Sequence, residues 1–201
     1  MFNGRSTWIG KFFLAMRFMM NRFTVVCLML IVAASSAWAD PCKSGPKVNQ
    51  RPGPYSSVVS TGTNRGQSHC FICEAGDRPT VIIFARNLSD PLGKLVKHID
   101  KAVVQHKNKE LRAWVTFLAE DQPSFDPRVV QWAQRHAIGQ VPLGVFEDPV
   151  GPPTYLLHRE ADVTVLLSVK QRVVANFAYR TGELTEPAIA EIIKSLPQIV
   201  K

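Results

Sequence analysis

The sequence predicts an α/β domain with a central mixed sheet of about four strands and helices on both faces. Two continuous apolar runs, residues 80–86 and 111–118, are each followed by an Asp-Pro pair and a stretch of helical character. Two more apolar runs, residues 163–169 and 172–179, are separated by only two residues. Continuous apolar runs are typical of strands buried on both faces, and a two-residue separation is typical of an antiparallel hairpin. We therefore expect the first two strands to be parallel and the last two antiparallel.

The N-terminal 39 residues have the pattern of a signal peptide. Arg17 and Arg22 precede an apolar run over residues 23–34, and Ala37-Trp38-Ala39 then fits the A-x-A cleavage pattern. A run of about 12 apolar residues is shorter than the roughly 20 that cross a bilayer. The sequence thus predicts a signal peptide over residues 1–39 and a mature chain from Asp40. That chain would be exported to the periplasm, cell envelope or extracellular space, with no membrane span after cleavage.

The charge of the mature chain is mild and scattered. Four of the 24 basic residues and none of the 16 acidic residues lie in residues 1–39, so the net charge falls from +8 to +4 on cleavage. Nucleic-acid binding would need a basic stripe or patch, so no nucleic-acid partner is expected. The mature chain keeps Cys42, Cys70 and Cys73, and an exported location permits disulfides. Their odd number leaves one thiol to explain.

Residues 40–66 are rich in Pro, Gly, Ser and Asn and have no apolar period, which predicts a flexible tether. The folded domain is then expected over residues 67–201. After the strand at 80–86, Asp90 can cap a helix with Pro91 at its first position. Apolar residues follow at helical spacing: Leu92, Leu95, Val96, Ile99, Ala102 and Val103.

The second half of the chain continues the pattern. Asp126-Pro127 predicts the start of a helix that runs to about His136, and Gly139 ends it. Residues 141–160 predict an irregular connection with a short strand at 143–146 and one helical turn near Tyr155. Lys170-Gln171 would form the hairpin turn, but neither residue favours the required backbone, so a longer loop is the alternative. A last helix from about Thr185 should bury four apolar residues: Ile189, Ile192, Ile193 and Leu196.

This order of elements resembles the thioredoxin-like fold. Residues 131–143 and the passage Glu147-Asp148-Pro149-Val150-Gly151 are similar to a helix and a D-P-x-G passage of peroxiredoxins and periplasmic thioredoxins. Residues 163–179 are similar to their terminal hairpin. The resemblance covers about residues 79–200, and it implies a thioredoxin-like domain and exchange of thiols and disulfides.

The sequence departs from these families at the usual active site. Active thioredoxins carry Cys-x-x-Cys after the first central strand, where this chain has Asn87 to Leu92 without a cysteine. Val163 stands where thioredoxins have a cis-proline, and the peroxiredoxin pattern P-x-x-x-T-x-x-C is absent. Cys70 and Cys73 instead precede the strand at 80–86, whose length of about 20 Å separates them from the usual position.

The candidate site is therefore Cys70 and Cys73, with His69 beside them. As a redox dithiol, one thiolate attacks a disulfide and the second cysteine resolves the mixed disulfide, and a protonated His69 would activate Cys70. Three alternatives stay open: a structural disulfide within the pair, a disulfide to Cys42, and a metal site. A zinc site needs about four ligands, of which one Cys-x-x-Cys supplies two. No cofactor is expected, since Glu74 replaces the His of a c-type haem motif.

The position of the pair also predicts its reactivity. At the amino end of the sheet it would lack the helix dipole that stabilises a thiolate in the usual site. The thiol of Cys70 is then expected to have a nearly ordinary pKa of about 8.5 and weak reductase activity.

Overall fold

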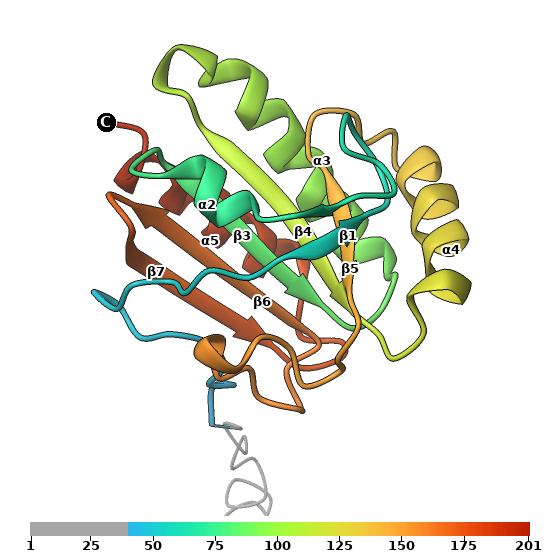
Figure 1. Cartoon of the computed structure of the whole chain (residues 1–201). Helices are drawn as coiled ribbons and strands as arrows, with labels where there is room; N and C mark the ends of the chain where they lie inside the picture. The colour runs from blue at the N-terminus through green and yellow to red at the C-terminus, as the bar shows by residue number, and fades with distance from the viewer. Residues whose placement is uncertain (1–39) are drawn as a thin grey trace, which may run out of the picture. The chain divides into compact units, whose positions relative to one another are not determined.

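The computed structural model describes residues 40–201 and places Pro41–Lys201 in one compact unit (Figure 1). The predicted signal peptide and its cleavage site lie outside the described residues. The sheet has seven strands in the order β2-β1-β5-β4-β3-β6-β7, rather than about four. The strands are β1 Ser57–Val59, β2 Ser68–His69, β3 Thr80–Ala85, β4 Arg112–Leu118, β5 Leu143–Phe146, β6 Val163–Val169 and β7 Arg172–Tyr179.

The helices are α2 Phe71–Ala75, α3 Asp90–Gln105, α4 Gln122–Arg135 and α5 Glu186–Ser195, with 3-10 turns η1 Lys107–Lys109, η2 Pro153–Tyr155 and η3 Leu196–Gln198. β3 and β4 are parallel along their whole length, and β6 is antiparallel to both β3 and β7. These pairings confirm the predicted directions of the four main strands. The short strand at 143–146 and the turn near Tyr155 are also present.

The hairpin turn between β6 and β7 has the two residues that the sequence predicts. Lys170 and Gln171 both have positive φ, 52° and 56°, which is costly for residues other than Gly, Asn and Asp. Asp77 compensates from outside the hairpin: its carbonyl accepts from Lys170 N at 3.0 Å, and its carboxylate accepts from Gln171 Nε2 at 2.9 Å. Tertiary contacts therefore hold a turn that local sequence does not favour.

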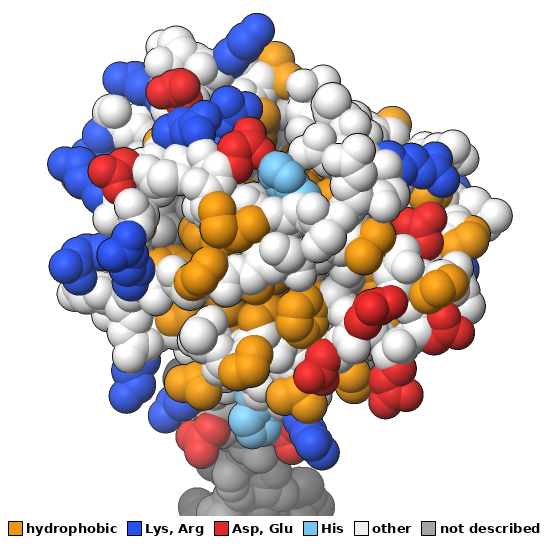
Figure 2. Space-filling view, viewed as in Figure 1, with side chains coloured by type: hydrophobic (Ala, Val, Ile, Leu, Met, Phe, Trp, Pro, Cys, Tyr) orange, Lys and Arg blue, Asp and Glu red, His pale blue; other side chains and the backbone are white. Residues whose placement is uncertain are grey.

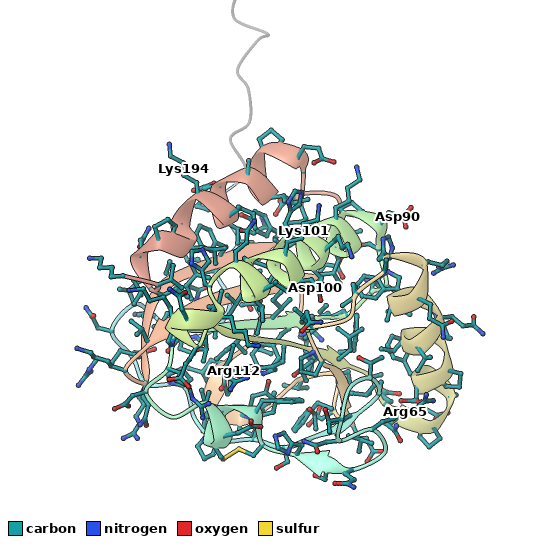
Figure 3. All side chains as sticks on the ribbon, turned by 90° about the horizontal axis from the view of Figure 1, so that it is seen from above. Arg65, Asp90, Asp100, Lys101, Arg112 and Lys194 are labelled. Carbon is teal, nitrogen blue, oxygen red and sulfur yellow. A yellow bond between two sulfur atoms is a disulfide. The ribbon has the colours of Figure 1, made fainter. Side chains whose placement is uncertain are left out.

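The two faces of the sheet are covered differently. α3, α4 and α5 pack on one face, where Ile83, Val115 and Val165 point into the larger core. The other face presents Ile82, Phe84, Trp114 and Leu166 to a smaller core. Figure 3 looks along these layers, with α3 and α5 on one side and α2 on the other. Helices thus lie on both faces, but α2 and η2 are the short elements of the second face.

The segment expected to be a tether is part of the domain instead. Residues 57–59 form β1, which joins β5 to β2 in the sheet. Ser44 is buried, and its Oγ lies 2.8 Å from Thr164 Oγ1. Tyr55 is buried among the aromatic rings of the smaller core. Pro and Gly here shape an extended covering segment, so the compact unit begins at Pro41 and not near Gln67.

Two helix starts differ from the prediction. Ser89, not Asp90, caps α3, because its Oγ accepts from Leu92 N at 3.4 Å. α4 begins at Gln122 rather than near Asp126, because the Asp121 carboxylate accepts from Ser124 N at 3.1 Å. The capping residue is therefore Asp121, and Pro123 lies in the first turn. Asp126-Pro127, the predicted start, lies inside the helix.

Gly93 lets α3 approach His136 at the end of α4. A Cβ atom at Gly93 would lie 2.4 Å from ring atoms of His136. We expect Gly93→Ala to lower the free energy of unfolding by about 1–2 kcal/mol, because this overlap outweighs the gain of about 1 kcal/mol in helix propensity. Urea denaturation measures it. The control is Gly139→Ala, whose Cβ meets no atom within 4 Å. Equal losses in both variants would contradict the prediction.

Candidate active site

The short helix α2 holds the two cysteines together. Cys70 is its N-cap residue, and Cys70 Sγ accepts from the backbone N–H of Cys73 at 3.3 Å. Cys70 and Cys73 form a disulfide, with their Cα atoms 5.3 Å apart. At the other end of α2, Arg78 donates to the carbonyls of Glu74 and Ala75. Sequence reasoning missed α2, because five residues are too few to show a helical period.

The expectation that the cysteines lack a helix N-terminus is therefore wrong. In the reduced protein, the N–H of Cys73 would donate to a Cys70 thiolate, and such charge-assisted bonds are stronger than neutral ones. α2 has little more than one turn, so its dipole is smaller than that of a full helix. Cys73 is exposed and Cys70 is half-buried, so exposure does not single out Cys70 as the attacking thiol.

His69 is engaged with neighbours other than the sulfur atoms. Its Nε2 lies 2.8 Å from Glu74 Oε2, and its Nδ1 lies 3.2 Å from Asn64 Nδ2. The Glu74 carboxylate accepts from Nε2–H, since an ionised carboxylate can only accept. The ring also packs edge-to-face on Phe71, with centroids 4.6 Å apart. His69 thus connects the β1–β2 loop to α2. Its ring nitrogens bond to Asn64 and Glu74 and not to Cys70 Sγ, so no direct contact supports the predicted activation of Cys70.

α2 lies at the amino end of the sheet, as its place before β3 predicts. Phe71 stacks on Trp114 of β4, with ring centroids 5.7 Å apart. Figure 2 shows hydrophobic side chains across the centre of the face that carries α2, with Lys and Arg gathered along one side. The helix that carries the disulfide is therefore joined to β4 by an aromatic contact.

The carboxyl end of β3, where thioredoxins carry their cysteines, is closed by structural contacts. Arg86 donates to the carbonyl of Ala161 at 2.9 Å and to that of Pro149, and its burial lowers the pKa of its guanidinium. Asn87 Nδ2 donates to Asp162 Oδ1 at 2.7 Å. These bonds hold the connection between β5 and β6 against the carboxyl end of β3. Residues 87–92, which follow β3, contain no cysteine.

Cys42 lies at this opposite end as a free thiol. Its neighbour Ser44 contacts Thr164 and accepts from His158 N. Thr164 pairs with Phe84 near the carboxyl end of β3, whereas Cys70 lies at the amino end. The length of β3, about 20 Å, therefore separates Cys42 and His158 from Cys70. A disulfide from Cys42 to the pair is therefore excluded in this fold. Burial raises the pKa of the Cys42 thiol. Within residues 40–201, no group of three or more His, Cys, Asp or Glu side chains could hold a metal ion.

A cavity of about 590 Å³ adjoins α2. Its lining comes from the end of β1, the β1–β2 loop, α2, α3, the start of β4 and the segment after α4: Val59, Thr61, Gly62, Thr63, Asn64, Phe71, Glu74, Ala75, Val103, Arg112, Ala113, Trp114, Ile138, Gly139, Gln140, Val141 and Pro142. This volume is in the range of sites that bind small ligands or a few residues of a peptide. No pattern in the sequence marks these residues, because they meet only in the folded sheet.

Among the described helices, none is long and apolar enough to span a bilayer.

Solved structures share the architecture at low sequence identity. A Bacteroides thetaiotaomicron protein, provisionally assigned as a protein disulfide isomerase, has a TM-score of 0.60 at 14% identity over 79% of this chain and 94% of its own. The peroxidoxin BcpB of Mycobacterium tuberculosis has a TM-score of 0.53 at 13% identity over 77% and 98%. A DsbF homologue of Corynebacterium diphtheriae has a TM-score of 0.51 at 14% identity over 75% and 87%. No protein-family model and no curated protein matches the sequence.

Proposed function

Because the chain has the thioredoxin-like fold, we propose that it is an exported thiol–disulfide oxidoreductase with Cys70 and Cys73 as its redox pair. The observation that carries the proposal is the pair itself: an accessible Cys-x-x-Cys disulfide that starts a helix and has a backbone N–H aimed at Cys70 Sγ. The names of similar structures, a provisionally assigned disulfide isomerase and a DsbF homologue, support this class of reaction. The signal-peptide pattern of residues 1–39 supports export.

The exchange proceeds in two steps. In the reduced protein, the Cys70 thiolate attacks one sulfur of a substrate disulfide, forms a mixed disulfide and releases one substrate thiolate. The Cys73 thiolate then attacks Cys70 Sγ, releases the second substrate thiolate and leaves the Cys70–Cys73 disulfide. The substrate gains two electrons and the protein loses two. An external dithiol must reduce the protein again before another turnover.

The second candidate is a redox-silent module in which the disulfide is a staple. One observation favours it: Glu74 and Asn64 occupy the ring nitrogens of His69, so His69 is not placed to donate a hydrogen bond to Cys70. A disulfide that closes a four-residue ring stabilises a fold by about 2 kcal/mol in the chain-entropy model. In this case the segment 41–66 or the connection 147–162 would serve as the binding surface.

Insulin reduction with dithiothreitol tests the proposal. We expect the wild type to accelerate the precipitation of the insulin B chain. The rate with Cys70→Ser should be at least about 100-fold lower, because the serine hydroxyl cannot form the mixed disulfide. Cys42→Ser is the matched control, since it removes a cysteine at the opposite end of the sheet, and it should keep the wild-type rate. Equal, negligible rates for the wild type and Cys70→Ser would reject the enzyme and favour the staple.

A further inference from the structure

The sheet has a notch beside α2, at the start of β4. β5 pairs with β4 only from Val115 onward, where Val115 lies opposite Leu143. The first three residues of β4, Arg112–Trp114, therefore pair with β3 on one side, and no strand of the described residues 40–201 pairs with them on the other. This unpaired stretch is about 10 Å long, at about 3.3 Å per residue. All three residues line the cavity of about 590 Å³.

The backbone of Ala113 faces this notch. Arg112 N donates to Pro79 O on the β3 side, whereas Val115 N donates to Pro142 O on the β5 side. Since backbone groups alternate along a strand, the N–H and C=O of Ala113 point to the β5 side, as those of Val115 do.

The chain itself prevents the ladder from extending to Ala113. The next rung would need an N–H at position 142 for Ala113 O, and Pro142 has none. It would also need Gln140 O to accept from Ala113 N, but the Gln140 backbone is held elsewhere, with its N–H 2.6 Å from Asp100 Oδ1. Within residues 40–201, no hydrogen-bond partner is found for these two groups of Ala113, a residue only 6% exposed. Because Ala113 lines the cavity, these two groups present one donor and one acceptor to whatever enters it.

The walls of the notch suit a polypeptide. The half-buried Phe71 gives it aromatic surface, and the buried Trp114 supports that ring from below and has its N–H bonded to Tyr55. Arg112 and Glu74 are the charged residues among the described lining, and their charges cancel. A small anionic ligand would need an excess of cations, whereas an extended peptide offers the donor and acceptor that Ala113 lacks and side chains for the aromatic surface.

We propose that this notch binds an extended segment of a protein partner, which adds as a short strand beside Arg112–Trp114. Given the proposed redox function, this partner is the substrate. Phe71 and Glu74, which line the notch, directly follow Cys70 and Cys73 in the chain, so a segment held there contacts the helix that carries the disulfide. The substrates are therefore proteins with a disulfide next to an extended apolar stretch, rather than small-molecule disulfides.

Binding is tested on the full chain with both Cys70→Ser and Cys73→Ser, so that redox chemistry plays no part. The probe is fluorescein-labelled insulin B chain, reduced and carboxamidomethylated, followed by fluorescence anisotropy. Gly139→Phe adds a ring to the lining at a position where a Cβ meets no atom within 4 Å, and Gly139→Ala is its matched control. We expect Gly139→Ala to bind as the parent does and Gly139→Phe to bind at least tenfold more weakly.

Amide hydrogen exchange of the parent gives a readout that needs no variant at the notch. Without the probe, the Ala113 amide should exchange much faster than that of Val115, and the probe should protect it at least tenfold. Unchanged exchange at Ala113, equal affinity of the two Gly139 variants, or displacement by equimolar oxidised glutathione would each overturn the notch proposal. Binding without insulin reduction by the wild type would reject only the redox function, and reduction without binding would reject only the notch.

Discussion

Asp100→Ala is expected to lower the free energy of unfolding by about 3–5 kcal/mol. The Asp100 carboxylate is buried in α3, 7% exposed, and points toward the segment after α4 (Figure 3). Its Oδ1 accepts the backbone N–H groups of Gly139, Gln140 and Val141 at 3.0, 2.6 and 3.0 Å. Hydrogen bonds to a charged acceptor contribute about 1.5–3 kcal/mol each, and a buried N–H left without an acceptor adds a cost. Alanine removes all three bonds at once.

Two controls separate this anchor from a general effect of the substitution. Asp100→Asn keeps one acceptor oxygen without the charge and should lose about half as much. Asp90→Ala, at the start of the same helix with an 87% exposed side chain, should lose at most about 1 kcal/mol. Urea denaturation gives all three values. If Asp100→Ala and Asp90→Ala lose the same free energy, Asp100 does not hold the segment that lines the notch.

The main strands could be predicted because each carries its signal locally. β3, β4 and the β6–β7 hairpin are continuous apolar runs, and all of β3 is buried, as such a run requires. The amino-end position of the cysteines could also be predicted, since Cys73 precedes Thr80 and strand direction fixes the rest. What followed from neighbouring residues along the chain was therefore accessible from the sequence.

The missed features depend on partners far away in the sequence. Asp100 lies among the apolar residues of α3 but bonds to residues 39–41 positions later. The Ala113 notch requires the register of β4 against β5, which no local pattern encodes. His69 was predicted to act on Cys70, the nearest thiol in the sequence, but folding offers it Asn64 and Glu74. Polar side chains with several partners within reach are decided by tertiary structure rather than by adjacency.

Tyr55 shows most clearly why the tether prediction was wrong. In the sequence it is one aromatic residue in a Pro-rich and Gly-rich stretch. In the fold its hydroxyl accepts from Trp114 Nε1 at 2.8 Å and shares a hydrogen bond of 2.8 Å with Thr116 Oγ1. Its ring lies 5.4 Å from that of Phe84 and 5.2 Å from that of Tyr155. Burial also raises the pKa of Tyr55, which keeps its hydroxyl protonated.

We expect Tyr55→Ala to lower the free energy of unfolding by about 3–5 kcal/mol, the usual cost of removing a large buried aromatic side chain. The variant should also release the covering segment, so that trypsin cleaves after the exposed Lys47 much faster than in the wild type. Tyr55→Phe is the matched control: it keeps the ring but leaves the buried Trp114 N–H without an acceptor, for a loss of about 1–3 kcal/mol. Slow cleavage after Lys47 in Tyr55→Ala, with a wild-type urea midpoint, would mean that other contacts fasten the segment and that Tyr55 is not its anchor.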